Sequence, residues 1–227
     1  MKKILNYFTK FELFLWSFCT ALIVVSFFLF EKESYLTLIA SVIGVTAIIF
    51  NAKGNFIGPL LMINFSIIYG IISFSFSYYG EMITYVGMSM PMAICSLFSW
   101  VKNPYKENKA QVKIRPLKKS DIVLMVILAA AVTVAFYFIL KYFNNANLEL
   151  STLSVATSFV AAYLNFLRCP YFALAYAFND IVLIPLWILA SIHDTKYISV
   201  VVCFIAFLLS DAYSFVNWSK MKKKQEE

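Results

Sequence analysis

The chain has 227 residues, of which 62% are hydrophobic and only 14% are charged, and its formal net charge is +7. A soluble domain is about 45–50% apolar and about 25% charged. This composition therefore excludes an ordinary soluble enzyme or binding module and indicates an integral membrane protein. The positive charge alone would also suit a nucleic-acid-binding protein, so the placement of the basic residues has to decide between these classes.

Eight apolar stretches are candidates for helices that cross a bilayer, although the second and the sixth are short for this purpose. The first follows a basic segment and lacks a small-residue cleavage site, so we predict a retained span and not a cleaved signal peptide. The predicted spans are Phe11–Phe30, Tyr35–Phe50, Phe56–Tyr78, Met82–Trp100, Ile122–Phe143, Thr152–Leu167, Tyr171–Ala190 and Tyr197–Trp218.

The basic residues give an independent check on this count, because Lys and Arg near span ends are retained on the cytoplasmic side. With eight spans and a cytoplasmic N-terminus, all but three of the 19 Lys and Arg residues lie inside; the exceptions are Lys32, Lys141 and Lys196. We therefore predict a multi-pass plasma-membrane protein with both termini in the cytoplasm. Its charge serves topology and lipid contact, not nucleic-acid binding.

The residue types that usually hold metals are not clustered in this sequence. Cys19, Cys95, Cys169 and Cys203 form no CxxC pair and have no His cluster near them, so we predict four buried small apolar side chains. The single histidine, His193, falls in an outer turn and is expected to be solvated. The sequence predicts no metal and no cofactor.

An internal repeat divides the chain at the long loop KNPYKENKAQVKIRPLKKSD, where Asn103-Pro104 should end the fourth helix and Ser120 should cap the fifth. Sliding the sequence by 115 residues (168 − 53 = 115) places Lys53 on Arg168 and Asn64 on Asn179. Each half has three spans and one linking span separates them, which gives parallel repeats. The predicted segments are an extra N-terminal helix (1–34), a first repeat (35–103), the loop and linker helix (104–148), a second repeat (149–218) and a basic tail (219–227).

The run Tyr171–Ala190 carries Asn179 and Asp180 near its middle, at the depth of the bilayer midplane. A carboxylate at this depth costs about 2.5–3.5 kcal/mol on insertion scales and therefore needs polar partners. Hydrogen bonds between helices would satisfy the pair, and so would a hydrophilic molecule that crosses the membrane.

Helical spacing gathers further polar and aromatic groups on faces that could line a path for such a molecule. Amides, hydroxyls, carboxylates and aromatic rings together suit a neutral or singly cationic ligand with hydroxyls and a flat ring. A phosphate would require Arg or Lys within the membrane, and the sequence has none at midspan. The candidate substrate-binding residues are Asn64, Thr84, Tyr85, Met88, Ser89, Tyr176, Asn179, Asp180, Trp187, Asp211 and Tyr213.

Several other features have simpler interpretations. Trp100, Trp218 and Tyr78 lie at span ends, which is typical of the interfacial aromatic belt. Pro91 and Pro185 could be packing kinks or hinges of a moving transporter, and faces rich in Ser and Thr are commonly packing surfaces.

Several sequence segments resemble the PnuC-type vitamin transporters over almost the whole chain from Tyr35 to Trp218. The similar segments are AKGNFIGPLLMINFSIIYGIISF, NPYKEN, TSFVAAYLNFLRCPYFALAYAFND with a later LW, and DAYSFVNW. The resemblance implies a SWEET-like fold and uptake of nicotinamide riboside, a precursor of NAD, with trapping by a cytoplasmic kinase. By this resemblance, the binding positions of the family correspond to Asn179 and Asp211. Some members have a Trp one turn before the Asn and a Gln in the fourth helix, where this chain has Ala175, and Tyr85 with Ser89.

We therefore expect an all-α membrane protein with an extra N-terminal helix and a 3+1+3 SWEET-like core that moves nicotinamide riboside by facilitated diffusion with alternating access. A homo-oligomer is compatible with this expectation. Thiamine or riboflavin is the alternative substrate, and a structural or sensor protein is a second alternative. An intramembrane enzyme is disfavoured because the sequence has no GxSxG or HExxH motif, and no GxxxxGK[ST] loop indicates ATP use.

Overall fold

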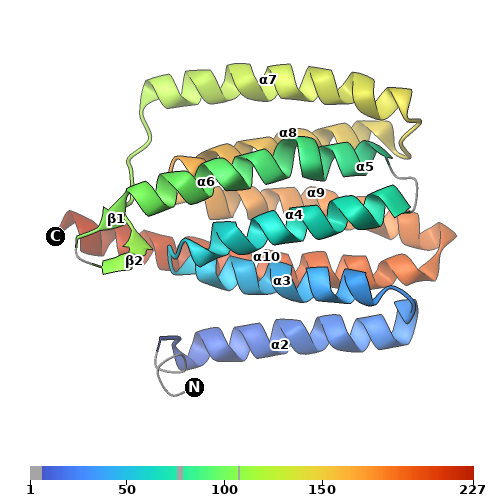
Figure 1. Ribbon diagram of the computed structural model, residues 1–227, viewed down its shortest axis with the longest axis horizontal. Coiled ribbons are helices and arrows are strands. Elements are labelled where there is room, and N and C mark those ends of the chain that lie inside the picture. The colour runs from blue at the N-terminus through green and yellow to red at the C-terminus, as the bar shows by residue number, and fades with distance from the viewer. Residues whose placement is uncertain (1–6, 76–78, 107) are drawn as a thin grey trace.

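A computed structural model describes residues 7–75, 79–106 and 108–227, and the described chain is almost entirely helical (Figure 1). The elements are α2 (Lys10–Ser26) with the π-turn η1 (Phe27–Glu31), α3 (Tyr35–Ala52), α4 (Ile57–Ser75), α5 (Tyr79–Thr84) with the π-turn η2 (Tyr85–Ser89), α6 (Met90–Lys102), β1 (Pro104–Tyr105), β2 (Asn108–Val112), α7 (Lys119–Tyr142), α8 (Leu148–Phe166), α9 (Tyr171–His193), the short 3-10 helix η3 (Thr195–Tyr197) and α10 (Ile198–Glu226).

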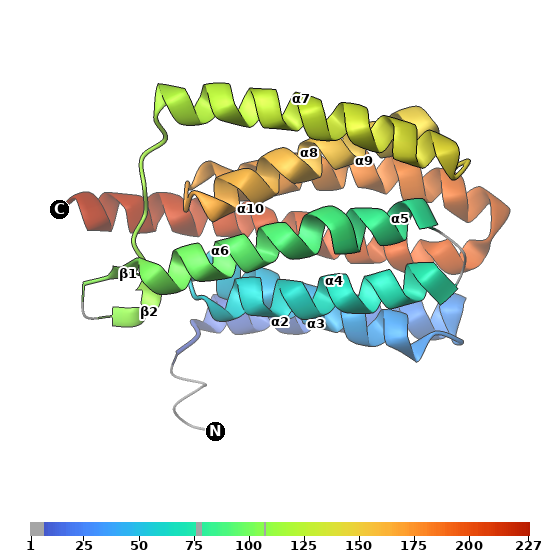
Figure 2. The same ribbon diagram turned by 45° about the horizontal axis from the view of Figure 1, so that its top comes forward.

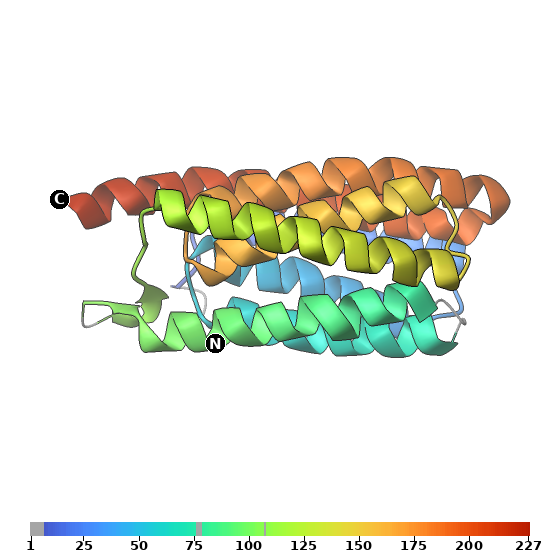
Figure 3. The same cartoon turned by 90° about the horizontal axis from the view of Figure 1, so that it is seen from above.

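These elements form eight rods that run along one long axis, in agreement with the eight predicted spans (Figure 3). Within the described residues, seven helices are long and apolar enough to cross a membrane. The exception is α8, the predicted short sixth span, in which Ser and Thr residues dilute the apolar content. Its length of 19 residues still matches the other rods.

Six of the rods form a ring in the order α3, α4, α6, α8, α9 and α10, and α10 packs on α3 to close it. The linker helix α7 lies outside this ring against α8, and α2 lies on the opposite side of the molecule against α3 and α10 (Figures 1 and 2). We call the end where α2 begins, α10 ends and the β1–β2 hairpin lies the basic end. Lys53, Lys102 and Arg168 are also at this end.

The two three-helix units run in the same direction, as the predicted parallel repeat requires. The turn after α3 and the turn after α8 have the same backbone form, with Gly54 at φ 65° and Arg168 at φ 58°. The structural offset is therefore 168 − 54 = 114, and the starts of α4 and α9 give the same value (171 − 57 = 114). The predicted register of 115 is wrong by one residue.

This one-residue error changes which side chains are equivalent, because each residue turns a helix by 100°. The position equivalent to Asn179 is Phe65, and that equivalent to Asp180 is Ser66. Asn64, which the sequence register paired with Asn179, is exposed on the outer face of α4. Its amide donates to the carbonyl oxygen of Leu60 within the same helix at 3.0 Å.

Some local details also differ from the sequence prediction. The fourth helix ends at Lys102, before Asn103-Pro104, as predicted. The linker helix, however, begins at Lys119, and the Asp121 carboxylate accepts the backbone N–H of Lys118 at 3.0 Å, so Ser120 is not its cap. The β1–β2 hairpin and the two π-turns were not predicted, and the basic tail continues α10. Lys2, Lys3 and Tyr78 lie outside the described residues.

The cysteine prediction holds for three of four residues, because Cys19, Cys169 and Cys203 are buried whereas Cys95 is exposed. The interpretation of Trp100 and Trp218 as interfacial residues is wrong, since both side chains are fully buried at the basic end of the ring. His193 is the last residue of α9, at the opposite end.

A buried carboxylate fixes the extra helix α2 to the ring. Glu12 is 1% exposed, and its oxygens accept hydrogen bonds from Lys53 Nζ at 3.0 and 3.2 Å and from the Tyr213 hydroxyl at 2.9 Å. The backbone N–H of Thr9 donates to the same carboxylate at 2.7 Å. Lys53 follows α3 and Tyr213 lies on α10, so Glu12 joins α2 to both three-helix units.

We expect Glu12→Ala to destabilise the protein by about 3–5 kcal/mol, because removing one partner of a buried ion pair leaves the others unpaired. Thermal unfolding in detergent measures this effect. Glu226→Ala is the matched control, since Glu226 is 65% exposed and lies 3.8 Å from Lys222. Its loss should change stability by less than about 1 kcal/mol. Equal effects of the two variants would contradict the role of Glu12.

Candidate functional site

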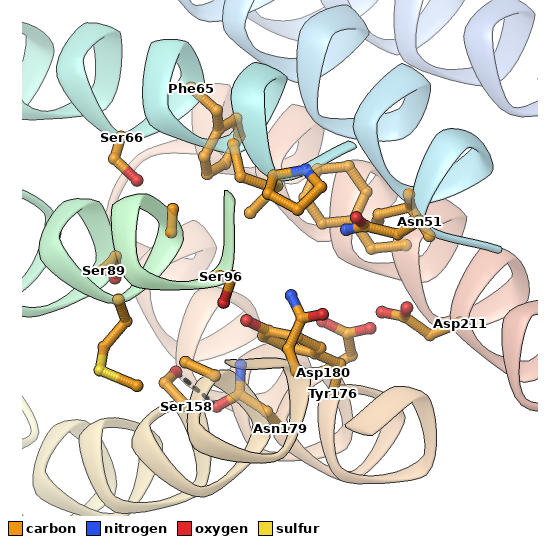
Figure 4. A pocket seen from close by; sticks show the side chains of 18 of the residues that line it. Asn51, Phe65, Ser66, Ser89, Ser96, Ser158, Tyr176, Asn179, Asp180 and Asp211 are labelled. Atoms are coloured by element: carbon orange, nitrogen blue, oxygen red, sulfur yellow. Dashed lines mark hydrogen bonds between the residues drawn. The ribbon is translucent and has the colours of Figure 1, made fainter. Parts of the chain in front are cut away.

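A cavity of about 110 Å³ lies inside the ring, and every ring helix contributes to its lining. Figure 4 shows that its walls combine amides, hydroxyls and carboxyls with aromatic rings. Each three-helix unit supplies one side of the lining, so the cavity lies between the two repeats. A site in this position is the arrangement that transporters built from repeats commonly have.

Asn179 on α9 has a fixed orientation in this cavity. Its amide oxygen accepts hydrogen bonds from the hydroxyls of Thr157 at 2.7 Å and Ser158 at 2.9 Å, both on α8. The amide nitrogen lies on the cavity side (Figure 4). The same side chain thus joins two helices and presents hydrogen-bond donors to the cavity, so the packing and binding interpretations of this residue are compatible.

Two carboxyl groups, Asp180 on α9 and Asp211 on α10, approach each other in the cavity wall (Figure 4). Both residues are at least 96% buried, and they lie within hydrogen-bonding reach of each other. Asp180 Oδ2 has no hydrogen-bond partner. Two buried carboxyl groups this close to each other share one proton, so the pair carries a single negative charge, and this charge favours a ligand that carries a positive one.

Two aromatic side chains of the first repeat, Phe65 and Tyr85, line the cavity, and Tyr69 packs behind them. The ring of Tyr85 packs on Tyr69, with 5.1 Å between centroids, and on Phe65 at 6.1 Å. Tyr85 is on the π-turn η2, which interrupts the helix at the cavity. A flat ring could stack on this cluster, and a cationic ring would add a cation–π contribution of about 0.5–2 kcal/mol.

The structure brings six of the eleven predicted binding residues to this cavity, namely Tyr85, Ser89, Tyr176, Asn179, Asp180 and Asp211. Thr84 and Trp187 line an adjoining cavity toward the end opposite the basic one. Three others lie elsewhere: Asn64 is exposed, Met88 is buried in the apolar core, and Tyr213 contacts Glu12.

Five further residues line the cavity that were not among the predicted binding residues, namely Asn51, Asn165, Ser66, Ser96 and Phe65. Asn51 and Asn165 lie near the ends of their helices, where an amide is unremarkable. A repeat register of 114 would have found both, because 165 − 51 = 114. The correct repeat register therefore points to these two residues, whereas their residue types alone do not.

Four hydrogen bonds between the two repeats form a set at the basic end, which we call the latch. Trp100 Nε1 and Ser99 Oγ on α6 donate to the main-chain oxygens of Asn165 and Phe166, at 3.0 and 2.8 Å. Reciprocally, Trp218 Nε1 and Asn217 Nδ2 on α10 donate to the main-chain oxygens of Asn51 and Ala52, both at 2.7 Å. The two indole rings are 5.5 Å apart, so the latch closes the ring next to the cavity.

Comparison with known proteins agrees with this architecture. The sequence profile of the family described as "Nicotinamide mononucleotide transporter" matches residues 34–220, which is most of the chain and includes both repeats. The chain belongs to the nicotinamide mononucleotide transporter family. This transporter is therefore a membrane protein that moves a solute and not an enzyme. The matched region begins after α2 and η1 and ends within α10.

Two relatives in this family have the name nicotinamide riboside transporter PnuC. The protein of Neisseria mucosa is 24% identical over 87% of this transporter and 76% of its own length. The protein of Haemophilus influenzae is 21% identical, over 85% and 82%. A crystal structure of the vitamin B3 transporter PnuC matches with a TM-score of 0.81 at 23% identity, covering 96% of this chain and 94% of the other, which confirms the fold.

Proposed function

We propose that this transporter takes up nicotinamide riboside, which has a cationic pyridinium ring and a ribose with free hydroxyls. The observation that carries the proposal is the composition of the cavity wall. It combines a carboxyl pair for the positive charge, an aromatic cluster for the ring, and amides for the hydroxyls. The names of the two relatives support the same substrate.

The family description names the mononucleotide, whereas the relatives are named for the riboside, and these ligands differ by one phosphate. A buried phosphate would need Arg or Lys partners. Among the described residues that line the cavity there is no Lys, Arg or His. Two carboxyl groups in the same wall would also repel a phosphate. This charge distribution supports the riboside.

Facilitated diffusion with alternating access is the mechanism that we propose for this fold. The latch joins the two repeats at the basic end, and a cavity between repeats can become accessible at either end if they rock against each other. The described part of the chain holds no nucleotide-binding loop. With the termini in the cytoplasm of the cell and the protein in its plasma membrane, the latch would close the cytoplasmic side.

Metabolic trapping by a cytoplasmic riboside kinase follows from the same charge argument. A cavity that accepts the riboside and rejects its phosphate would not return the phosphorylated product. Net uptake could then continue without an energy source in the transporter itself. The kinase acts on the released solute, so the proposal requires no contact between the two proteins.

Calorimetry on purified protein tests the substrate, with nicotinamide riboside, its 5′-phosphate, thiamine and riboflavin as ligands. We expect the riboside to bind and the phosphate to bind at least 10-fold more weakly, because the cavity wall has no cation for it. Preferential binding of thiamine or riboflavin would replace the substrate but keep the fold and mechanism. Equal binding of the riboside and its phosphate would contradict the charge argument.

A further inference from the structure

Two asparagines related by the internal repeat, Asn51 near the end of α3 and Asn165 near the end of α8, line the cavity at its basic end. Both are 4% exposed. The side-chain oxygen Oδ1 of each has no hydrogen-bond partner. A buried acceptor without a donor costs about 1–3 kcal/mol, and native proteins rarely leave one in place without a reason.

The surroundings of the two side chains explain how they are held beside the cavity. The side-chain oxygen of Asn51 packs directly against Gly58, where any larger residue would displace it. The carboxamide of Asn165 lies within hydrogen-bonding reach of the hydroxyl of Tyr176, which also lines the cavity. Asp180 Oδ2 is a third unpartnered acceptor in the same wall. Ser66 Oγ is the fourth buried atom of this wall without a partner, so three of the four are amide or carboxyl oxygens. These three oxygens are complementary to the donors of a ligand.

We propose that Asn51 and Asn165 are a repeat-related pair of ligand-binding residues whose side-chain oxygens accept hydrogen bonds from the hydroxyls of a sugar-bearing ligand. This inference rests on the proposed function and adds the orientation of the ligand in the site. The sugar points toward the basic end, and the flat ring lies against Tyr85 and Phe65.

The same two residues also carry the latch. The main-chain oxygen of Asn51 accepts the indole N–H of Trp218, and that of Asn165 accepts the indole N–H of Trp100. In each repeat, one asparagine therefore binds a ligand hydroxyl through its side chain and an indole N–H through its main-chain oxygen. Occupation of the site and closure of the basic end become linked through this pair.

Asn51→Leu and Asn165→Leu test the proposal by calorimetry with nicotinamide riboside and analogues that each lack one ribose hydroxyl. We expect each variant to weaken riboside binding by about 3–10-fold, the effect of one neutral hydrogen bond. One analogue lacks the hydroxyl that the substituted residue would bind. This analogue should have the same affinity for the wild-type protein and for that variant. Asn64→Leu is the matched control, because that asparagine is exposed on the outer face of α4.

The outcomes separate this inference from the proposed function. Failure of the wild-type protein to bind the riboside would contradict the proposed substrate. Wild-type binding with unchanged affinity in both Leu variants, or an equal loss for every analogue, would overturn the role of the pair. If a Leu variant does not fold, Asn51→Asp and Asn165→Asp preserve shape and acceptor. These variants should then retain the discrimination between the riboside and the analogues.

Discussion

We expect the Asp180→Asn variant to bind nicotinamide riboside about 10–100-fold more weakly than the wild-type protein. The side chain is 3% exposed and lies beside Asp211, so little water screens its interaction with a positive charge in the cavity. Hydrogen bonds to charged groups contribute about 1.5–3 kcal/mol, and 1.4 kcal/mol corresponds to a tenfold change in affinity. Asparagine keeps the size of the side chain, so the change removes one acidic group of the carboxyl pair without changing the shape of the cavity. Asp211→Asn should act in the same direction.

A neutral ligand of the same shape separates charge from shape in this experiment. Reduced nicotinamide riboside has an uncharged dihydropyridine ring and the same ribose. The Asp180→Asn variant should therefore lose more affinity for the cationic riboside than for the neutral, reduced riboside. Asp194→Asn is the control, since Asp194 is 42% exposed and pairs with Lys196 outside the cavity. An equal loss for both ligands would mean that Asp180 binds hydroxyls instead of the ring charge.

The features of the fold that depend on hydrophobicity and charge could be predicted from the sequence. The eight rods, the linker between two parallel repeats and the end of the fourth helix at Asn103-Pro104 all follow from apolar length, basic turns and helix-breaking residues. The polar stripe of α9 was also predictable, because Tyr176, Asn179 and Asp180 share one face at helical spacing. The structure brings these three residues to the cavity.

The features that depend on register or on contacts between distant helices could not be predicted in this way. With the repeat register wrong by one residue, Asn64 was predicted to face the cavity. Its side chain is instead exposed on the outer face of α4. The position of Trp100 and Trp218 near span ends is equally typical of interfacial residues. Only the packing of α6 on α8 and of α10 on α3 shows that these indoles are buried between repeats.

The second large effect that we expect is at the latch, where the double variant Trp100→Phe, Trp218→Phe should favour opening at the basic end. Phenylalanine retains much of the apolar contact but cannot donate to the main-chain oxygens of Asn165 and Asn51. A hydrogen bond contributes about 0.5–1.5 kcal/mol net, so two of them amount to about 1–3 kcal/mol. The open population should rise about 5–150-fold, because 1.4 kcal/mol corresponds to a factor of ten.

Labelling of Cys169 measures this opening. The residue follows Arg168 in the turn beside the latch, and it is only 1% exposed in the closed protein. In a background where the other three cysteines are replaced, a maleimide reagent should react slowly with the parent protein and faster with the double variant. Trp16→Phe is the matched control, since its indole donates to Thr46 Oγ1 on the outer side of α3, away from the latch. Equal acceleration by the control would indicate general loosening of the bundle. An unchanged rate in the double variant would mean that the indole hydrogen bonds do not limit opening, and the closed state would then depend on the packing of the two rings.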